Sequence, residues 1–208
     1  MKKLLALLFS VFFLSSPSVF ADDISDFEIE GISIGDSLLD HMTEEEILKQ
    51  IELNKDRYLH LKEPNKYVDV IFGQDFPTYE SVVVMIQNNS INKYVTEKNE
   101  KYTILSIRGG NKYTEDFDGC IKERDKIMAV ISEKFPNAQK KASVYNSASD
   151  PSEKSIVDKF SYILKSGSQV SGFCTNYDET FRIEKNWSDG LVISIDSSAI
   201  KNWLGGHK

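Results

Sequence analysis

The stretch IVDKFSYILKSGSQVSGFCTNY, residues 156–177, decides most of the expected fold. Its two outer runs, 156–164 and 170–177, are rich in β-branched and aromatic residues, as strands are. The segment between them, KSGSQ, contains the glycine that a hairpin turn favours. Strands joined by so short a connection pair antiparallel. The stretch therefore predicts an antiparallel sheet rather than the parallel sheet of an α/β protein.

Similar runs on both sides of this hairpin predict the rest of the sheet. Residues 23–35 alternate apolar and polar side chains, which indicates one or two short strands broken at Gly31. The run 81–87 (SVVVMIQ) is apolar for most of its length, as in a strand buried on both faces. The polar residues 88–101 then form the tip of a long hairpin. Further strands are expected at 66–72, 102–110, 142–146 and 191–196.

One long amphipathic helix is expected at about 115–135, where apolar residues recur at helical spacing and Pro136 stops the pattern. Thr43 and Glu46 form a capping box that opens a helix over 44–53, and a short C-terminal helix is expected over 198–204. The predicted fold class is therefore α+β: a mostly antiparallel sheet packed against one long amphipathic helix (about 115–135), plus short N- and C-terminal helices.

Residues 1–21 have the pattern of a signal peptide. Lys2 and Lys3 precede the apolar run 4–14, and small residues lead to a cleavage site after Ala21. The apolar run is too short to cross a bilayer as a helix. The expected organisation is a signal peptide (1–21) and one globular domain (22–208). The domain is expected to be exported, to the periplasm or alternatively to the extracellular space.

Two cysteines, Cys120 and Cys174, lie in the expected mature chain. Cysteines of exported proteins usually pair, because the compartment is oxidising. A Cys-x-x-Cys redox motif is not present in the sequence. The two residues therefore predict a structural disulfide.

Composition and charge exclude several classes of function. The net charge is −7, and loss of Lys2 and Lys3 with the leader makes it two units more negative, so nucleic acid is not an expected partner. No later segment is apolar for long enough to cross a membrane. His41, His60 and His207 lack the spacing of zinc ligands, and no metal or other cofactor is predicted.

Gly35-Asp36-Ser37-Leu38 resembles the motif of the GDSL (SGNH) hydrolases, and the resemblance implies a serine esterase. It implies Ser37 as the nucleophile, Asn111 of the GGNK segment in the oxyanion hole, and His207 as the base, oriented by a distant aspartate such as Asp196. The sequence departs from that family, because the Asp-x-x-His motif is missing near His207.

The favoured interpretation of the same residues is structural. The first strand alternates polar and apolar side chains, whereas the central parallel strand of such a hydrolase is apolar throughout. Gly35 is then a turn residue, Asp36 or Ser37 caps a short helical turn at 38–42, and Leu38 and Leu39 belong to the core. The GDSL resemblance is judged coincidental, and no catalytic residue is favoured.

Residues 23–47 resemble the N-terminal signature of a family of small exported proteins of unknown function from marine bacteria. That family shares a DFEIEG-SIGDSLLD opening, a helix with one cysteine, and an apolar strand followed by Trp-Leu. The chain matches at 26–40, at Cys120 and at 191–204. The resemblance implies no activity.

The sequence therefore predicts a non-enzymatic exported protein that binds a ligand or serves an envelope protein as an accessory. The alternative is the GDSL-type esterase. Nine tyrosines, twelve phenylalanines and Trp187 also leave room for an aromatic binding platform on loops. A structural or adhesive surface protein would predict repeats or an anchor, and the sequence contains neither. The ligand, the partner and the oligomeric state are not predicted.

Overall fold

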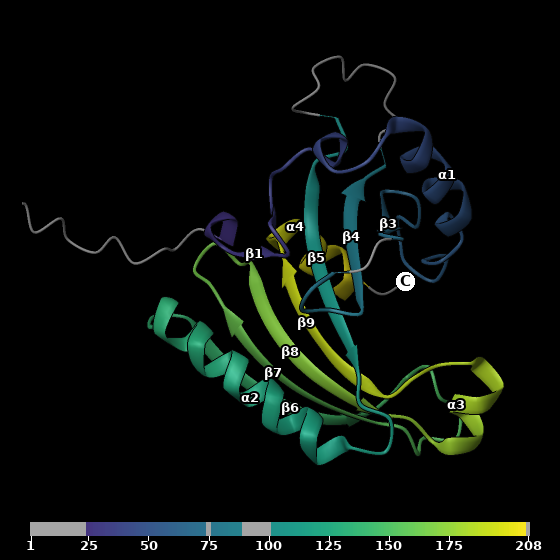
Figure 1. Cartoon of the computed structure of the whole chain (residues 1–208), viewed down its shortest axis with the longest axis vertical. Helices are drawn as coiled ribbons and strands as arrows, with labels where there is room; N and C mark the ends of the chain where they lie inside the picture. The colour runs from purple at the N-terminus through teal and green to yellow at the C-terminus, as the bar shows by residue number, and fades with distance from the viewer. Residues whose placement is uncertain (1–23, 74–75, 89–100, 207–208) are drawn as a thin grey trace, which may run out of the picture.

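The computed structural model describes residues 24–73, 76–88 and 101–206 (Figure 1). The predicted signal peptide, the tip of the long hairpin and His207 lie outside these residues. A small ribbon near the N-terminus consists of β1 (Glu28–Ile29) and β2 (Ile32–Ser33). The main sheet has seven strands: β3 (Tyr67–Ile71), β4 (Ser81–Gln87), β5 (Ile104–Lys112), β6 (Gln139–Asn146), β7 (Ile156–Ile163), β8 (Gln169–Asn176) and β9 (Gly190–Asp196).

Every neighbouring pair of strands in the sheet is antiparallel, in the order β3-β4-β5-β9-β8-β7-β6. The hairpin predicted over 156–177 is β7–β8, with Gly167 at φ +84° in its turn. The last strand, β9, lies between β5 and β8 and joins the two halves of the sheet. The prediction of an antiparallel α+β fold is confirmed.

Within the described ranges, four α-helices accompany the sheet: α1 (Glu44–Asn54), α2 (Phe117–Lys134), α3 (Glu179–Lys185) and α4 (Ser198–Gly205). Short 3-10 turns form at Ile24–Asp26 and Leu38–Asp40. The predicted capping box is present at the start of α1, where Thr43 and Glu46 bind each other's backbone N–H groups. Helix α3 was not predicted.

The prediction of one long amphipathic helix over about 115–135 is not supported. The helices are short, and several of them pack on the sheet. Helix α2 starts only at Phe117, since the Asp116 carboxylate caps the chain by accepting the N–H of Gly119 at 3.0 Å. It ends at Lys134. Its buried side includes Arg124 and is therefore not a continuous apolar stripe.

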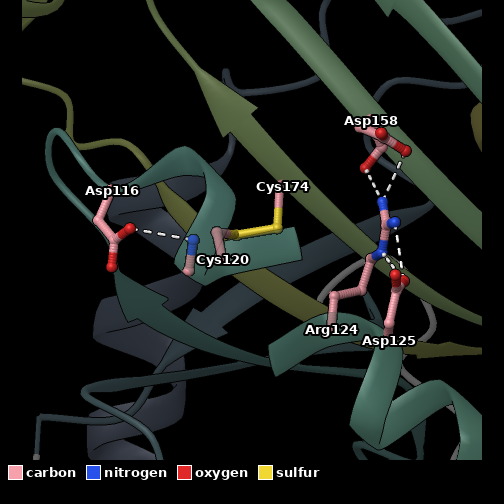
Figure 2. The surroundings of a disulfide bond; sticks show 7 residues. Asp116, Cys120, Arg124, Asp125, Asp158 and Cys174 are labelled. Atoms are coloured by element: carbon pink, nitrogen blue, oxygen red, sulfur yellow. Dashed lines mark hydrogen bonds and ion pairs between the residues drawn. A yellow bond between two sulfur atoms is a disulfide. The ribbon is translucent and has the colours of Figure 1, made fainter. Parts of the chain in front are cut away.

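A disulfide joins α2 to the sheet. Cys120 of α2 bonds to Cys174 of β8, as predicted (Figure 2). One helical turn further, the buried Arg124 donates to Asp158 of β7, both to its carboxylate at 2.6 Å and to its backbone carbonyl at 3.0 Å. Figure 2 shows the disulfide and this ion pair as two attachments of one helix to neighbouring strands. Helix α2 is thus held at a fixed position on β7 and β8.

Helices cover both faces of the sheet. The larger core lies on the α2 side and includes Val84, Ile107, Val170, Ile193 and Ile195. On the other face, α4 packs against the first strands, and its Trp203 lies edge-on to Tyr58 and Tyr67. Its indole N–H donates to the carbonyl of Glu63 at 2.8 Å. Helix α4 covers only part of this second face.

Asp150 makes the turn between β6 and β7 sensitive to acid. Its carboxylate accepts hydrogen bonds from the side chains and backbone N–H groups of Ser155 and Ser152. These hydrogen bonds, that of the Ser155 hydroxyl foremost, hold the pKa of Asp150 below its usual value. A group with a lowered folded pKa stabilises the fold above its unfolded pKa, here about 3.9, and this contribution is lost as the pH falls.

We therefore expect Asp150→Asn to reduce the loss of stability on acidification. Urea unfolding at intervals between about pH 2 and 6 measures this dependence. The slope of the unfolding free energy against pH should be smaller in Asp150→Asn than in the wild type. Asp56→Asn, at an exposed position, removes the same charge and is the control. Equal slopes in Asp150→Asn and wild type would contradict the assignment.

Candidate functional site

The sheet face opposite α2, between α4 and α3, carries a connected set of polar side chains. We call it the polar face, and it is built from alternate residues of neighbouring strands. One row across the strands is Asp69, Met85, Ser106, Asp196 and Gln169; the next is Val83, Arg108, Ser194, Ser171 and Ser161. Successive side chains of a strand point to opposite faces, so the residues before and after these along each strand point into the core on the α2 side.

Asp196 of β9 is the central carboxylate of the polar face. Its two oxygens accept hydrogen bonds from the hydroxyls of Ser106 and Ser194, at 2.6 and 2.7 Å. All three residues are buried. A buried carboxylate needs such partners, since an unpaired charge in the interior is costly. The hydroxyl protons of both serines are thereby directed at Asp196.

Two serines and a glutamine continue from this carboxylate toward the edge of the sheet. Ser171 shares a hydrogen bond of 3.0 Å with Ser161 and accepts one of 2.7 Å from the side chain of Gln169. Lys159 of β7 borders them, with its ammonium 5.9 Å from the centre of the Phe173 ring. Burial lowers the pKa of Lys159, and the nearby charges of Arg108 and Lys141 also lower it, while Asp196 opposes them.

At the other end of the polar face, Arg108 faces Asp69. The Asp69 carboxylate is buried; one oxygen accepts from Tyr58 and pairs with Arg57, both at 2.9 Å. Its second oxygen lies 4.0 Å from the Arg108 guanidinium and has no hydrogen-bond partner within the part of the chain that the structure describes. Burial opposes the charge of Arg108, but Tyr58, Asp196 and Asp69 together keep its pKa above the usual value.

A hollow of about 370 Å³ lies beside this network, at the end of the sheet near α3. Its rings come from Phe173 and Tyr177, and its hydroxyls from Ser81, Thr175 and Ser188. The remaining lining residues are Glu80, Gly110, Asn111, Lys112, Asp189, Gly190, Leu191 and Val192.

The ring of Tyr177 is fixed in place on the wall of the hollow. It packs against Phe181 and Trp187, with ring centres 5.9 and 5.3 Å away. Its backbone N–H donates to the Asp189 carboxylate at 2.7 Å, and its phenol is hydrogen-bonded to Thr175. Burial, and the charge of Asp189, raise the pKa of Tyr177. The phenol is therefore a neutral donor and acceptor at neutral pH.

Two glycines, Gly110 and Gly190, line the hollow without a side chain that would fill it. A Cβ at Gly190 would lie 2.3 Å from the carbonyl oxygen of Asn111, and one at Gly110 would lie 2.8 Å from the Ser81 hydroxyl. A side chain at Gly190 would collide with backbone, whereas one at Gly110 would require the Ser81 hydroxyl to turn away. Backbone groups therefore line the floor, within reach of a molecule in the hollow.

Ser37 and Asn111, the two described residues of the esterase hypothesis, do not come together. Ser37 pairs with Thr103 just before β5, whereas Asn111 is near the far end of that strand. Eight residues of strand at about 3.3 Å each separate the two positions by roughly 26 Å. His207, the third residue, lies outside the described residues. Asp196, which might have oriented it, binds Ser106 and Ser194 instead.

The surroundings of Ser37 are those of a turn. Gly35 has φ +98°, and Ser37 stands before the 3-10 turn Leu38–Asp40, with Leu38 fully buried. The Ser37 hydroxyl does not cap that turn but donates to the backbone carbonyl of Lys101 at 2.9 Å. Asp36 binds the N–H of Ser33 at 2.9 Å. Asn111 likewise holds a loop, since its amide binds the backbone of Glu80 and Thr78.

Within the described residues, no three His, Cys, Asp or Glu side chains gather closely enough to hold a metal ion. No described helix is both long and apolar enough to span a membrane. The comparisons add no relative: no protein-family model, no curated protein and no solved structure matches the chain.

The residues of the polar face were not found by sequence reasoning, although a signal for them exists. In LSIR (105–108) and ISID (193–196), a polar residue follows each apolar one. That alternation places Ser106, Arg108, Ser194 and Asp196 on one face of their strands. The alternation does not predict the order of the strands, and it is this order that places β5 beside β9.

Proposed function

We propose that the chain is an exported, non-enzymatic binding protein whose ligand occupies the hollow beside α3. The observation that carries this proposal is the lining of the hollow: two aromatic rings, several hydroxyls and exposed backbone around one concave site. Small-molecule sites have this character, with apolar surface for contact and a few polar groups for orientation. An accessory role toward an envelope protein is compatible with such a site.

The ligand class that fits this lining is a small hydroxyl-rich molecule such as a sugar unit. The faces of Phe173 and Tyr177 offer contact to C–H groups, while Thr175 and Ser81 offer hydrogen bonds to hydroxyls. The exposed Glu80 repels an anionic ligand, although Lys112, 4.0 Å away, offsets part of that charge. Asp189 is buried, and its carboxylate is paired with Arg182 at 3.7 Å. A neutral polyol therefore fits better than an acid.

The placement of Ser37 supports binding rather than ester hydrolysis. An attacking serine needs a base within hydrogen-bond reach, and the Ser37 proton is directed at a carbonyl oxygen. Asn111, which would stabilise the oxyanion, belongs to the other end of β5. The hollow itself offers hydroxyls but no nucleophile paired with a histidine among the described residues.

Export to the periplasm is part of the proposal. The disulfide between Cys120 and Cys174 supports it, because such bonds persist in oxidising compartments. The pattern of residues 1–21 supports it independently. We also infer kinship with the small exported proteins of marine bacteria that share the opening of this chain.

Calorimetric titration with glucose, N-acetylglucosamine, myo-inositol and cellobiose tests the proposed ligand class. We expect at least one of these to bind, and Tyr177→Ala to weaken that binding about tenfold, since a stacked ring contributes roughly 1 kcal/mol or more. Val144→Ala, at an exposed position on a distant edge strand, is the control and should bind as the wild type does. Absence of binding by all four compounds would contradict the ligand class.

A fluorophosphonate label distinguishes the esterase alternative. We expect no labelling of the folded mature chain beyond that of Ser37→Ala. Labelling that requires the fold and disappears in Ser37→Ala would make Ser37 an activated nucleophile and overturn the non-enzymatic assignment.

A further inference from the structure

The two outer strands of the sheet differ in how their free edges are covered. At β3, helix α1 lies alongside (Figure 1), and its Gln50 side chain accepts the backbone N–H of Ile71 at 3.4 Å. Strand β6 pairs with β7 along all eight residues without a register shift, and no described strand pairs with its other side. A regular strand with an unpaired edge is a template for a further strand.

The side chains of β6 are exposed, including apolar ones. Seven of its eight residues are exposed to solvent. Val144 is 67% exposed and Tyr145 47% exposed, and Ile156 of the adjoining strand is exposed beside them. Proteins usually protect such an edge with charges along its length or by covering it. Here the half from Val144 to Asn146 carries no charge.

The other half of β6 is basic. Lys140 and Lys141 are adjacent and therefore point to opposite faces of the sheet. Lys159 of β7 stands opposite Ser143, on the same face as Lys141. Strand β6 contains no acidic residue, although the whole chain has a net charge of −7. The free edge is thus a local basic site on an acidic protein.

A second hollow, of about 650 Å³, adjoins this edge on the α2 side. It is lined by Phe160 and Tyr162 of β7, by Lys140 of β6, and by one side of α2. The α2 residues are Arg124, Asp125, Met128, Ala129, Ser132 and Glu133, so the lining contains two carboxylates as well as two cations. The Lys140 ammonium lies 5.7 Å from the centre of the Tyr162 ring. Side chains of a strand added to β6 would extend past Lys140 toward this hollow. The edge therefore offers side-chain contacts as well as main-chain hydrogen bonds.

We propose that β6 accepts an extended acidic segment of a partner protein as an eighth strand of the sheet. Main-chain hydrogen bonds to β6 provide the attachment, and carboxylates opposite Lys140 and Lys141 set its register. The other end of the segment is apolar, to cover Val144 and Tyr145. A second copy of this chain is a poorer occupant, because its own β6 brings two more lysines and no carboxylate. The inference does not depend on the hollow beside α3.

The test uses a labelled, end-blocked peptide, Thr-Glu-Glu-Thr-Thr-Val-Val-Thr, whose adjacent glutamates match the adjacent lysines of β6, and measures its binding by fluorescence anisotropy. We expect binding to the mature wild type and a loss of about tenfold in the double variant Lys140→Glu/Lys141→Glu, since each reversed pair costs roughly 1 kcal/mol. The double variant Lys49→Glu/Lys62→Glu changes the net charge equally at exposed positions away from β6 and should bind as the wild type does. A peptide with Lys in place of Glu should prefer the Lys140→Glu/Lys141→Glu protein.

Hydrogen exchange distinguishes strand addition from other binding. The peptide should slow exchange of backbone amides within 139–146, because only pairing protects the outer edge of β6. Binding without that protection, or equal affinity in both double variants, would overturn the proposal. So would a protein that forms dimers through β6 and excludes the peptide, since the occupant would then be a second copy.

Discussion

Replacing Gly172 by valine is expected to destabilise the protein by about 3 kcal/mol, the upper part of the range for overpacked cores. Gly172 lies on β8 directly beneath α2. A Cβ there would stand 2.7 Å from Cγ of Arg124, 3.1 Å from the sulfur of Met128 and 3.2 Å from Cδ1 of Ile193. These neighbours cannot all move away, because Arg124 is anchored to Asp158 and the disulfide fixes α2.

Urea unfolding of Gly172→Val measures this cost, with Gly172→Ala expected to lie between the variant and the wild type. Gly205→Ala is the matched control: a Cβ at Gly205, at the end of α4, meets nothing within 4 Å. Its unfolding free energy should stay within about 0.5 kcal/mol of the wild type. A Gly172→Val protein as stable as Gly205→Ala would show that α2 does not lie where we describe it.

Removal of the disulfide is expected to have the largest effect, a loss of about 4 kcal/mol. The bond closes a loop between residues 54 positions apart, and the chain-entropy relation for that length gives this value. Both cysteines are buried, so the folded protein should resist reduction by dithiothreitol until it opens. Cys120→Ala/Cys174→Ala is the appropriate variant, since alanine leaves no buried thiol or hydroxyl.

Thermal unfolding with and without dithiothreitol measures this effect. The wild type should lose stability on reduction, whereas the double variant should be unaffected by the reductant and resemble the reduced wild type. A double variant as stable as the oxidised wild type would mean that the ion pair and the core hold α2 without the disulfide.

The sheet could be predicted from the sequence because its signals are local. The run at 81–87 coincides with β4, and Gly31 and the KSGSQ turn fall where expected. The disulfide could be predicted because the pattern of residues 1–21 predicts export to an oxidising compartment. Helix α3 could not, because it has seven residues and one buried side chain, Phe181. Helix α2 is shorter than predicted. Asp116 precedes the helix as its N-cap, and its carboxylate accepts the N–H of Gly119 in the first turn, so the helix begins only at Phe117.

The candidate site could not be assembled from the sequence, because it depends on contacts between distant residues. Asp196 binds Ser106, 90 residues earlier, only because β9 lies between β5 and β8. Gly35-Asp36-Ser37-Leu38, which resembles the hydrolase motif in sequence, forms a local turn. In the sequence, Phe173 and Tyr177 cannot be told from aromatic residues of the core. Only the order of the strands shows that both line the hollow.

We propose that the hollow beside α3 binds a small hydroxyl-rich molecule. The most direct test is a series of ¹H–¹⁵N spectra of the assigned, mature protein, recorded during titration with N-acetylglucosamine and cellobiose. We expect the backbone signals of Gly110, Thr175, Tyr177 and Gly190 to shift together and saturate. Shifts that saturate instead around Ser37 and Lys101, or no saturating shift anywhere, would contradict it.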